Sequence, residues 1–313
     1  MFTNAKTVMI GNKEVESIVT NNGGILYQKP STGPLFTLTT NKNYLVFSNN
    51  ESATLTATLT ENNRGVPDET VQFYSTSSQY VDNCSQTNLS KYDISLLTAT
   101  YTNNAYDFTL SHSGGGSTTR GVIKLPLVGF SDFSFEAKIL ASIVQENSEF
   151  GLVLSSSRWI NDHSISLKDT NGNKYFQLTE GSEYSAAGAW TTNKYYKLVL
   201  SLNGNLLTGT IYDNNNNQLF TDSCTLTSSV ISTFTGLEIL IGDAYPTGGM
   251  MSGSVKDIKV TGLNNNKVVE NLGAVTTDAN GVATKSFVGE AIGDVTIDAE
   301  CMNFQETVNL NVI

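Results

Sequence analysis

Residues 157–163, Ser-Arg-Trp-Ile-Asn-Asp-His, combine one aromatic ring with several hydrogen-bonding groups in a single predicted turn. Trp159 offers a flat apolar surface, and Asn161, Asp162 and His163 offer polar atoms. Sugar-binding sites use this combination, because a ring stacks on a pyranose while amides and carboxylates orient its hydroxyls. The alternative is that Trp159 packs in the core and His163 makes only a local hydrogen bond.

Two other turns carry side chains that could complete such a site. Tyr184 lies in one, and Asp243 and Tyr245 lie in the other, before Gly248 and Gly249. Glycine allows a ligand to approach the backbone closely. The predicted ligand-binding residues are therefore Trp159, Asn161, Asp162, His163, Tyr184, Asp243 and Tyr245.

Catalytic groups are sparse. His112 and His163 are the only histidines, and no serine lies in a Gly-x-Ser-x-Gly turn. Asp132 and Glu136 share one strand face but lie about 13 Å apart at the rise of a strand, which is too far for the carboxylate pair of glycoside hydrolysis. The alternative is a catalytic carboxylate pair formed by residues of two different strands, which the sequence alone does not reveal. We predict no catalytic residues and no enzymatic activity.

Two turns offer oxygen ligands of the kind that calcium takes. Residues 169–173 read Asp-Thr-Asn-Gly-Asn, and Asp213 is followed by Asn215 and Asn217. Neither has the later carboxylate of a complete calcium loop, and both fall where hairpin turns are expected. We therefore predict turn chemistry with no metal site and no cofactor, and calcium stays open as the alternative.

Composition limits the class of protein. The chain has 313 residues, of which 39% are apolar and 15% charged, and its formal net charge is −11. Such an acidic chain lacks the basic surface that nucleic acid requires, so we expect no nucleic-acid partner. No stretch approaches the ~20 apolar residues of a membrane span, and the start lacks the layout of a secretory signal. Cys84, Cys224 and Cys301 are predicted to be buried thiols.

Apolar and polar residues alternate along most of the chain. Residues 54–60, 132–139 and 196–202 all have this period of two, which is typical of strands with one buried face. Asn-Gly pairs at 171–172 and 203–204 separate such runs and predict hairpins. Short strands divided by polar turns indicate β-sandwiches or jelly rolls, so the predicted fold is all-β.

Residues 1–32 are predicted to be a small β-meander with strands over 6–10, 14–20 and 25–27. Because a unit this short cannot form a hydrophobic core of its own, we expect it to pack against another structure. Residues 28–34 follow as a linker with two of the five prolines.

Two distant segments together resemble a bacterial Ig-like domain of the invasin/intimin type. The first half of the pattern lies in residues 35–39, 52–59 and 65–74, and the continuation appears only in residues 272–284 and 293–299. The resemblance implies a split Ig-like β-sandwich formed by residues 33–78 and 267–313. A guest inserted at an exposed hairpin tip explains the gap, because the ends of such a guest lie close together.

The guest, residues 79–266, resembles a concanavalin A-like jelly roll of the laminin-G/lectin type. The strand patterns that carry the resemblance lie in residues 106–110, 130–139, 150–154, 190–200 and 253–260. In that family the position of Trp190 is buried, so a core role is expected for it. These are patterns of fold, and they carry no catalytic signature.

Residues 8–18 and 24–30 are similar to short leaders of phage and archaeal-virus tail or baseplate proteins. This resemblance implies that the protein is a virion part assembled in the host cytoplasm, with residues 1–32 docking on other virion tail proteins. We therefore expect a non-enzymatic tail or adhesion protein that binds a host cell-surface glycan or glycoprotein through the jelly roll. The alternatives are a structural decoration module without a ligand, an envelope polysaccharide depolymerase, and a cell-anchored adhesin.

Overall fold

In the computed structural model of the protein, almost every secondary-structure element among the described residues is a β-strand. This confirms the predicted all-β fold. The residues described are 9–10, 13–14, 17–19, 25–28, 33–47, 51–82, 84, 88–112, 119–129, 131–145, 147–156, 163–178, 190–244, 249–289 and 293–313. For 9–28 and for 88, 111, 112, 119, 243, 244 and 249 only the backbone is described.

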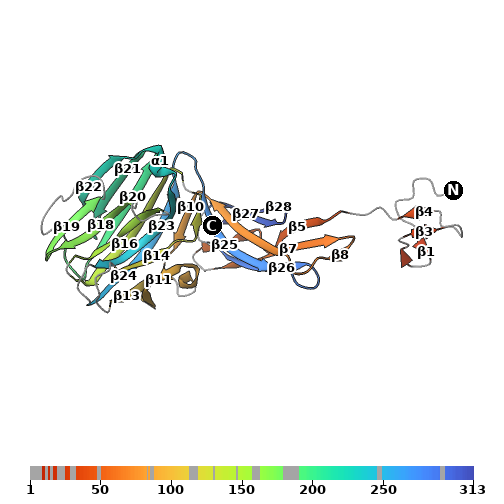
Figure 1. Cartoon of the computed structure of the whole chain (residues 1–313), viewed down its shortest axis with the longest axis horizontal. Helices are drawn as coiled ribbons and strands as arrows, with labels where there is room; N and C mark the ends of the chain where they lie inside the picture. The colour runs from red at the N-terminus through yellow and green to blue at the C-terminus, as the bar shows by residue number, and fades with distance from the viewer. Residues whose placement is uncertain are drawn as a thin grey trace.

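The large sandwich consists of two stacked sheets (Figure 1). The front sheet contains β10 (Gln79–Asp82), β12 (Leu97–Thr102), β13 (Ala105–His112), β16 (Phe133–Ile143), β20 (Tyr195–Asn203), β21 (Leu206–Tyr212), β22 (Gln218–Thr225) and β24 (Gly249–Gly262). The back sheet contains β11 (Asp93–Ser95), β14 (Thr119–Lys124), β17 (Glu149–Ser156), β18 (His163–Thr170), β19 (Asn173–Leu178) and β23 (Phe234–Ala244). A 3-10 turn, η2 (Asn88–Lys91), and a short helix, α1 (Ser228–Ile231), lie in connections.

Alternation along each strand builds the core between these sheets. In β16 the side chains of Phe133, Phe135, Ala137 and Ile139 are buried, and every second side chain points outward. Burial of these apolar faces is the main favourable term in folding such a sandwich. Trp190 is also buried in this core, as the sequence predicts.

The predicted hairpin turns are present. Asn171 and Gly172 have φ values of 53° and 79° between β18 and β19, and Gly204 has a φ of 58° between β20 and β21. Asn and Gly tolerate positive φ, which matches the twist of the flanking strands. The local sequence therefore fixes these turns.

The small sandwich has a core of its own and two sheets. One sheet contains β6 (Tyr44–Leu45), β9 (Thr70–Ser77), β15 (Leu127–Val128), β25 (Val268–Thr276), β27 (Gly293–Cys301) and β28 (Phe304–Val312). The other contains β5 (Leu35–Thr40), β7 (Ser52–Glu61), β8 (Arg64–Gly65) and β26 (Val282–Val288).

Strands from both ends of the chain pair inside the small sandwich. β9 pairs with β25 on one side and with β27 on the other, and Val275 lies opposite Val71. The chain leaves after Ser77 and returns before Val268, and these two residues are themselves register partners. The large sandwich is therefore inserted between two adjacent strands of the small one (Figure 1).

A third segment also joins the two sandwiches. β15 lies within the range 79–266 predicted for the jelly roll, yet it pairs with β25 and so completes a sheet of the small sandwich. The amide of Asn271 donates a 2.7 Å hydrogen bond to the carbonyl of Pro126 beside it. The sequence did not indicate this pairing, because a two-residue strand has no periodicity that a sequence could reveal.

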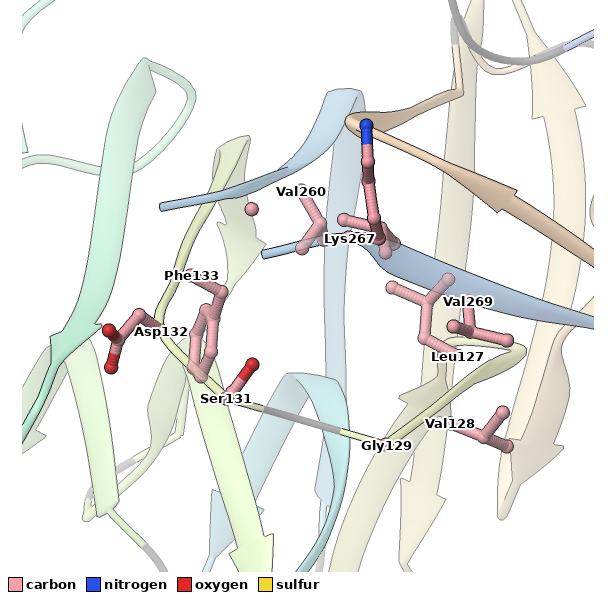
Figure 2. Close-up of a pocket in the computed structure, with 11 residues that line it drawn as sticks. Leu127, Val128, Gly129, Ser131, Asp132, Phe133, Val260, Lys267 and Val269 are labelled. Carbon is pink, nitrogen blue, oxygen red and sulfur yellow. The ribbon is translucent and has the colours of Figure 1, made fainter. Parts of the chain in front are cut away.

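Apolar side chains fill the junction beside β15. Figure 2 shows Leu127, Val128 and Val269 on one side of a small pocket and Phe133 on the other. The pocket has a volume of about 10 Å³, which is room for about one water molecule. This part of the junction is therefore closely packed.

The amino-terminal strands form two separate pairs in place of one three-strand meander. β1 (Met9–Ile10) pairs with β2 (Lys13–Glu14), and β3 (Ser17–Val19) pairs with β4 (Ile25–Gln28).

Candidate functional site

The outward side chains near the middle of the front sheet form what we call the charged face. They project from β16, β20, β21 and β24, and they alternate with the buried residues of the same strands. The residues of the charged face are Glu136, Lys138, Tyr195, Lys197, Tyr212, Lys256, Asp257 and Lys259.

Ion pairs hold the charged groups of this face in place. Glu136 lies between two ammonium groups, at 3.7 Å from Lys197 and 3.9 Å from Lys259. Lys138 lies opposite Lys197 in the strand register and pairs with Asp257 at 2.7 Å. Each exposed pair adds little stability, but together the pairs fix where five charges point.

Two lysines also lie over tyrosine rings. The Nζ of Lys197 is 4.7 Å from the ring centroid of Tyr212, and the Nζ of Lys256 is 4.0 Å from that of Tyr195. An ammonium over an aromatic face is attracted by the ring quadrupole. Partial burial, with the charge of nearby Asp107 adding to it, raises the pKa of Tyr195, so its hydroxyl stays protonated at neutral pH.

A groove of about 350 Å³ lies over the charged face. Glu136, Lys138 and Lys197 line it from the front sheet, Asn216 from the turn after β21, and Phe47 from the small sandwich. Ligand pockets usually have volumes of about 300–1,000 Å³. The groove is therefore large enough for a small polar ligand, and it presents both donors and acceptors.

Hydroxyl groups continue this polar surface across the neighbouring strands. Ser134 and Ser201 form a 3.0 Å hydrogen bond, and Thr210 and Thr221 lie 3.2 Å apart on β21 and β22. Hydroxyls both donate and accept hydrogen bonds. The outer surface of the front sheet can thus exchange hydrogen bonds with a polyhydroxylated ligand over several strands.

Most of the residues predicted to bind ligand lie outside the described residues. This is so for Trp159, Asn161, Asp162, Tyr184 and Tyr245, and for Asp243 only the backbone is described. Their role in binding stays a prediction.

His163 is the one predicted site residue with a described side chain. Its imidazole has no exposed surface and packs edge-on against Phe234, with ring centroids 5.6 Å apart. A ring buried in this way offers no face to a ligand, and the role of His163 in binding stays a prediction.

The strand register separates two parts of the predicted site. His163 lies opposite Leu154 of β17, which in turn lies opposite Leu237 of β23. Asp243 is six residues farther along β23, or about 20 Å away at the rise of a strand. The structure therefore does not bring Asp243 together with His163. The sequence could not predict this separation, because it does not show whether two turns lie at the same end of a sheet or at opposite ends.

Both turns considered for calcium use their carboxylates internally. Asp213 accepts hydrogen bonds from the amides of Asn215 and Asn217 and from the Asn217 side chain, which lower its pKa. Asp169 accepts from the amide of Gly172 and pairs with Lys174 at 3.0 Å. No cluster of metal-ligating side chains occurs among the described residues. These contacts are the turn chemistry that the sequence suggested.

Sequence reasoning missed most of the charged face. Of its residues only Glu136 was considered, and only as one half of a catalytic pair. The available signal was weak: Lys138, Lys197 and Lys259 each occupy a polar position in an alternating strand, as solvated lysines commonly do. Their convergence depends on the pairing of β16 with β20 and β24.

No protein-family model and no curated protein matches the sequence. Solved structures that are similar include peanut lectin with a 9-residue peptide, at 8% identity and a TM-score of 0.39 over 59% of this chain and 97% of that one. The alginate lyase from Klebsiella pneumoniae has 11% identity and a TM-score of 0.42 over 62% and 96%. The CBM2 module of the evolved Dit of a Lactobacillus casei phage has 14% identity and a TM-score of 0.35 over 64% and 99%. Similarity this low assigns the chain to no family.

Proposed function

We propose that this chain is a non-enzymatic virion protein of the tail or particle surface, and that it binds a host cell-surface glycan or glycoprotein through the large sandwich. The observation that carries the proposal is the charged face with its groove of about 350 Å³. Tyr195 and Tyr212 supply aromatic rings on the charged face beside the groove, and lysines and carboxylates supply hydrogen-bonding groups at fixed positions.

The chemistry of the groove suits a polyhydroxylated ligand. Sugars offer hydroxyls that bind to charged and polar side chains, and C–H faces that stack on aromatic rings. The groove is lined by ammonium groups, three carboxyl groups and an amide side chain. An apolar ligand would leave these groups desolvated without partners, which is costly.

The charged groups also favour binding over catalysis. Glu136 is held between two lysines, and Asp257 is paired with Lys138. Glycoside hydrolysis needs one protonated and one ionised carboxyl group facing the same bond. On this face Glu136 and Asp257 are each engaged in ion pairs with lysines, an arrangement that suits a binding surface.

The placement in a virion rests on the amino-terminal resemblance. Residues 1–32 are proposed to dock on other tail proteins, while the small sandwich carries the large one outward. Many copies on one particle would make weak individual contacts strong together. Among the described residues, no helix has the length and apolar character to cross a membrane.

A glycan array carrying host wall polysaccharides tests the proposal. The wild-type chain is expected to bind some of these glycans, and Tyr212→Ala is expected to bind them about tenfold more weakly, because it loses a ring of the charged face. Tyr175→Ala on β19 removes a half-buried tyrosine from the other sheet and serves as the matched control. An array without signal would favour a purely structural decoration module.

The depolymerase alternative has a separate test. Purified protein is incubated with each polysaccharide that it binds, and new reducing ends are measured. We expect none above the background of heat-denatured protein. An increase that Glu136→Gln abolishes would show that the charged face is catalytic and would overturn the non-enzymatic proposal.

A further inference from the structure

A second and larger cavity lies between the two sandwiches, away from the charged face. Its volume is about 570 Å³. Ser90 and Lys91 line it from η2 of the large sandwich, together with Pro126. Residues of β25 and β26 line it from the small sandwich. We call this space the junction cavity.

Two lysines from different sandwiches line the junction cavity together with one carboxylate. The Nζ of Lys91 is 3.8 Å from Oε1 of Glu270, while Oε2 of Glu270 accepts a 3.2 Å hydrogen bond from Ser75. Lys285 of β26 also acts electrostatically on Glu270. Two lysines and one carboxylate thus line the cavity, which gives its lining a positive balance.

Gly273 makes room for one of these ammonium groups. It has a φ of 89° at a bulge in β25, and a Cβ added there would lie 3.3 Å from the Nζ of Lys285. The ammonium group therefore lies directly over the backbone of the bulge. Bulges commonly re-aim side chains next to binding sites.

The rest of the lining provides apolar surface. Phe287 is almost fully buried, and Leu272 and Val288 are partly buried beside it. Pockets that bind small molecules usually combine such a surface with a few polar groups, and they often lie at domain interfaces. The junction cavity has this composition and lies at such an interface.

We propose that the junction cavity is a binding site for a small ligand of monosaccharide size that carries a carboxylate or phosphate. The oxyanion binds between Lys91 and Lys285, and the rest of the ligand packs against the half-buried Leu272 and Val288. This site is independent of the charged face. Because its two lysines belong to different sandwiches, a bound ligand stabilises the position of the large sandwich on the small one.

Isothermal titration calorimetry on the full chain tests the site with glucuronate, glucose 1-phosphate and neutral glucose. At least one anionic probe is expected to bind, and the two anionic probes distinguish a carboxylate from a phosphate ligand. Lys285→Met is expected to weaken binding about tenfold or more, since a charge-assisted hydrogen bond is lost. Lys91→Met should act likewise, which keeps the test decisive if one variant does not fold.

Lys259→Met is the matched control, because it removes a lysine of the charged face and leaves the junction cavity intact. It should leave binding of the anionic probe unchanged, whatever it does to glycan binding. Failure of both anionic probes to bind, binding of glucose with equal affinity, or full binding by a folded Lys285→Met variant would overturn the proposal. None of these results depends on the glycan array.

Discussion

The amide of Glu69 donates a 3.0 Å hydrogen bond to the hydroxyl of Thr277, although 208 positions separate the two residues along the chain. The same hydroxyl donates a 2.8 Å hydrogen bond to the carbonyl of Val66. The backbone of Thr277 pairs with Asp68 and Glu69 as well. One buried side chain thus joins the two halves of the small sandwich.

Thr277→Val is expected to lower the free energy of unfolding by about 1–3 kcal/mol. Valine keeps the shape of threonine but leaves the amide of Glu69 and the carbonyl of Val66 without this partner. Urea denaturation followed by circular dichroism measures the change. Thr284→Val, at an exposed position of β26, is the control and should cost almost nothing. Equal stability of the two variants would contradict the role of Thr277.

The small sandwich is expected to fold without its guest. Ser77 and Val268 are register partners in adjacent antiparallel strands, so an Asn-Gly turn can replace residues 78–267. Cooperative unfolding of the shortened chain, measured by urea denaturation, is the expected result. A shortened chain that is unfolded would show that the small core depends on the large sandwich.

The stability of the chain is expected to depend on the ionisation of Glu270. Burial raises the pKa of this carboxyl, although Lys91 and Lys285 oppose the shift and the charge of Asp82 adds to it. The native state therefore keeps the proton at a pH where the unfolded chain has lost it. This contribution is fully present below the ordinary pKa of glutamate, and it is lost as the pH rises through the raised value.

Glu270→Gln replaces the titrating carboxyl group by a neutral amide. The difference in stability between the wild type and this variant therefore reports the ionisation of Glu270 alone. Denaturation midpoints of both proteins are measured from about pH 4 to pH 8. The wild type should lose stability relative to the variant as the pH rises. A difference that is independent of pH, or one of the opposite sign, would show that Glu270 ionises normally in the folded state.

The three cysteines are expected to differ in reactivity. Cys84 and Cys301 are buried, and burial raises the pKa of both thiols, with the charge of Asp82 adding to the effect at Cys84. The thiolate is the reactive form, so only the half-buried Cys224 should react with a thiol reagent in the native protein. Spectroscopic titration should count one thiol in buffer and three in denaturant. Rapid native reaction of a Cys224→Ser variant would contradict this.

The strands of the fold could be predicted because their signals are local. Alternation in residues 132–139 reports which side chains face the core, and Asn171-Gly172 reports a hairpin, whatever the rest of the chain does. The resemblances in two distant segments also indicated that β9 and β25 belong to one sandwich. β15 was not predicted, because it has only two residues and pairs with β25, a strand far away in the sequence.

The site could be predicted far less well. Asp243 and His163 both lie in polar, turn-rich sequence, but the register of β17 with β23 places them at different ends of a sheet. The charged face was not predicted at all. Each of Lys138, Lys197 and Lys259 occupies an outward position of a strand, where lysine is common, so none of them indicates a site by itself. They meet Glu136 and Asp257 only because three strands pair in one particular register.

The sequence by itself determined the secondary structure, the turns and the all-β class, because each depends on the preferences of neighbouring residues. The tertiary structure decided which strands pair, and with them the charged face, the junction cavity and the joining of Glu69 to Thr277. The physical reason is that contacts between distant residues depend on register and loop closure, which short segments do not encode.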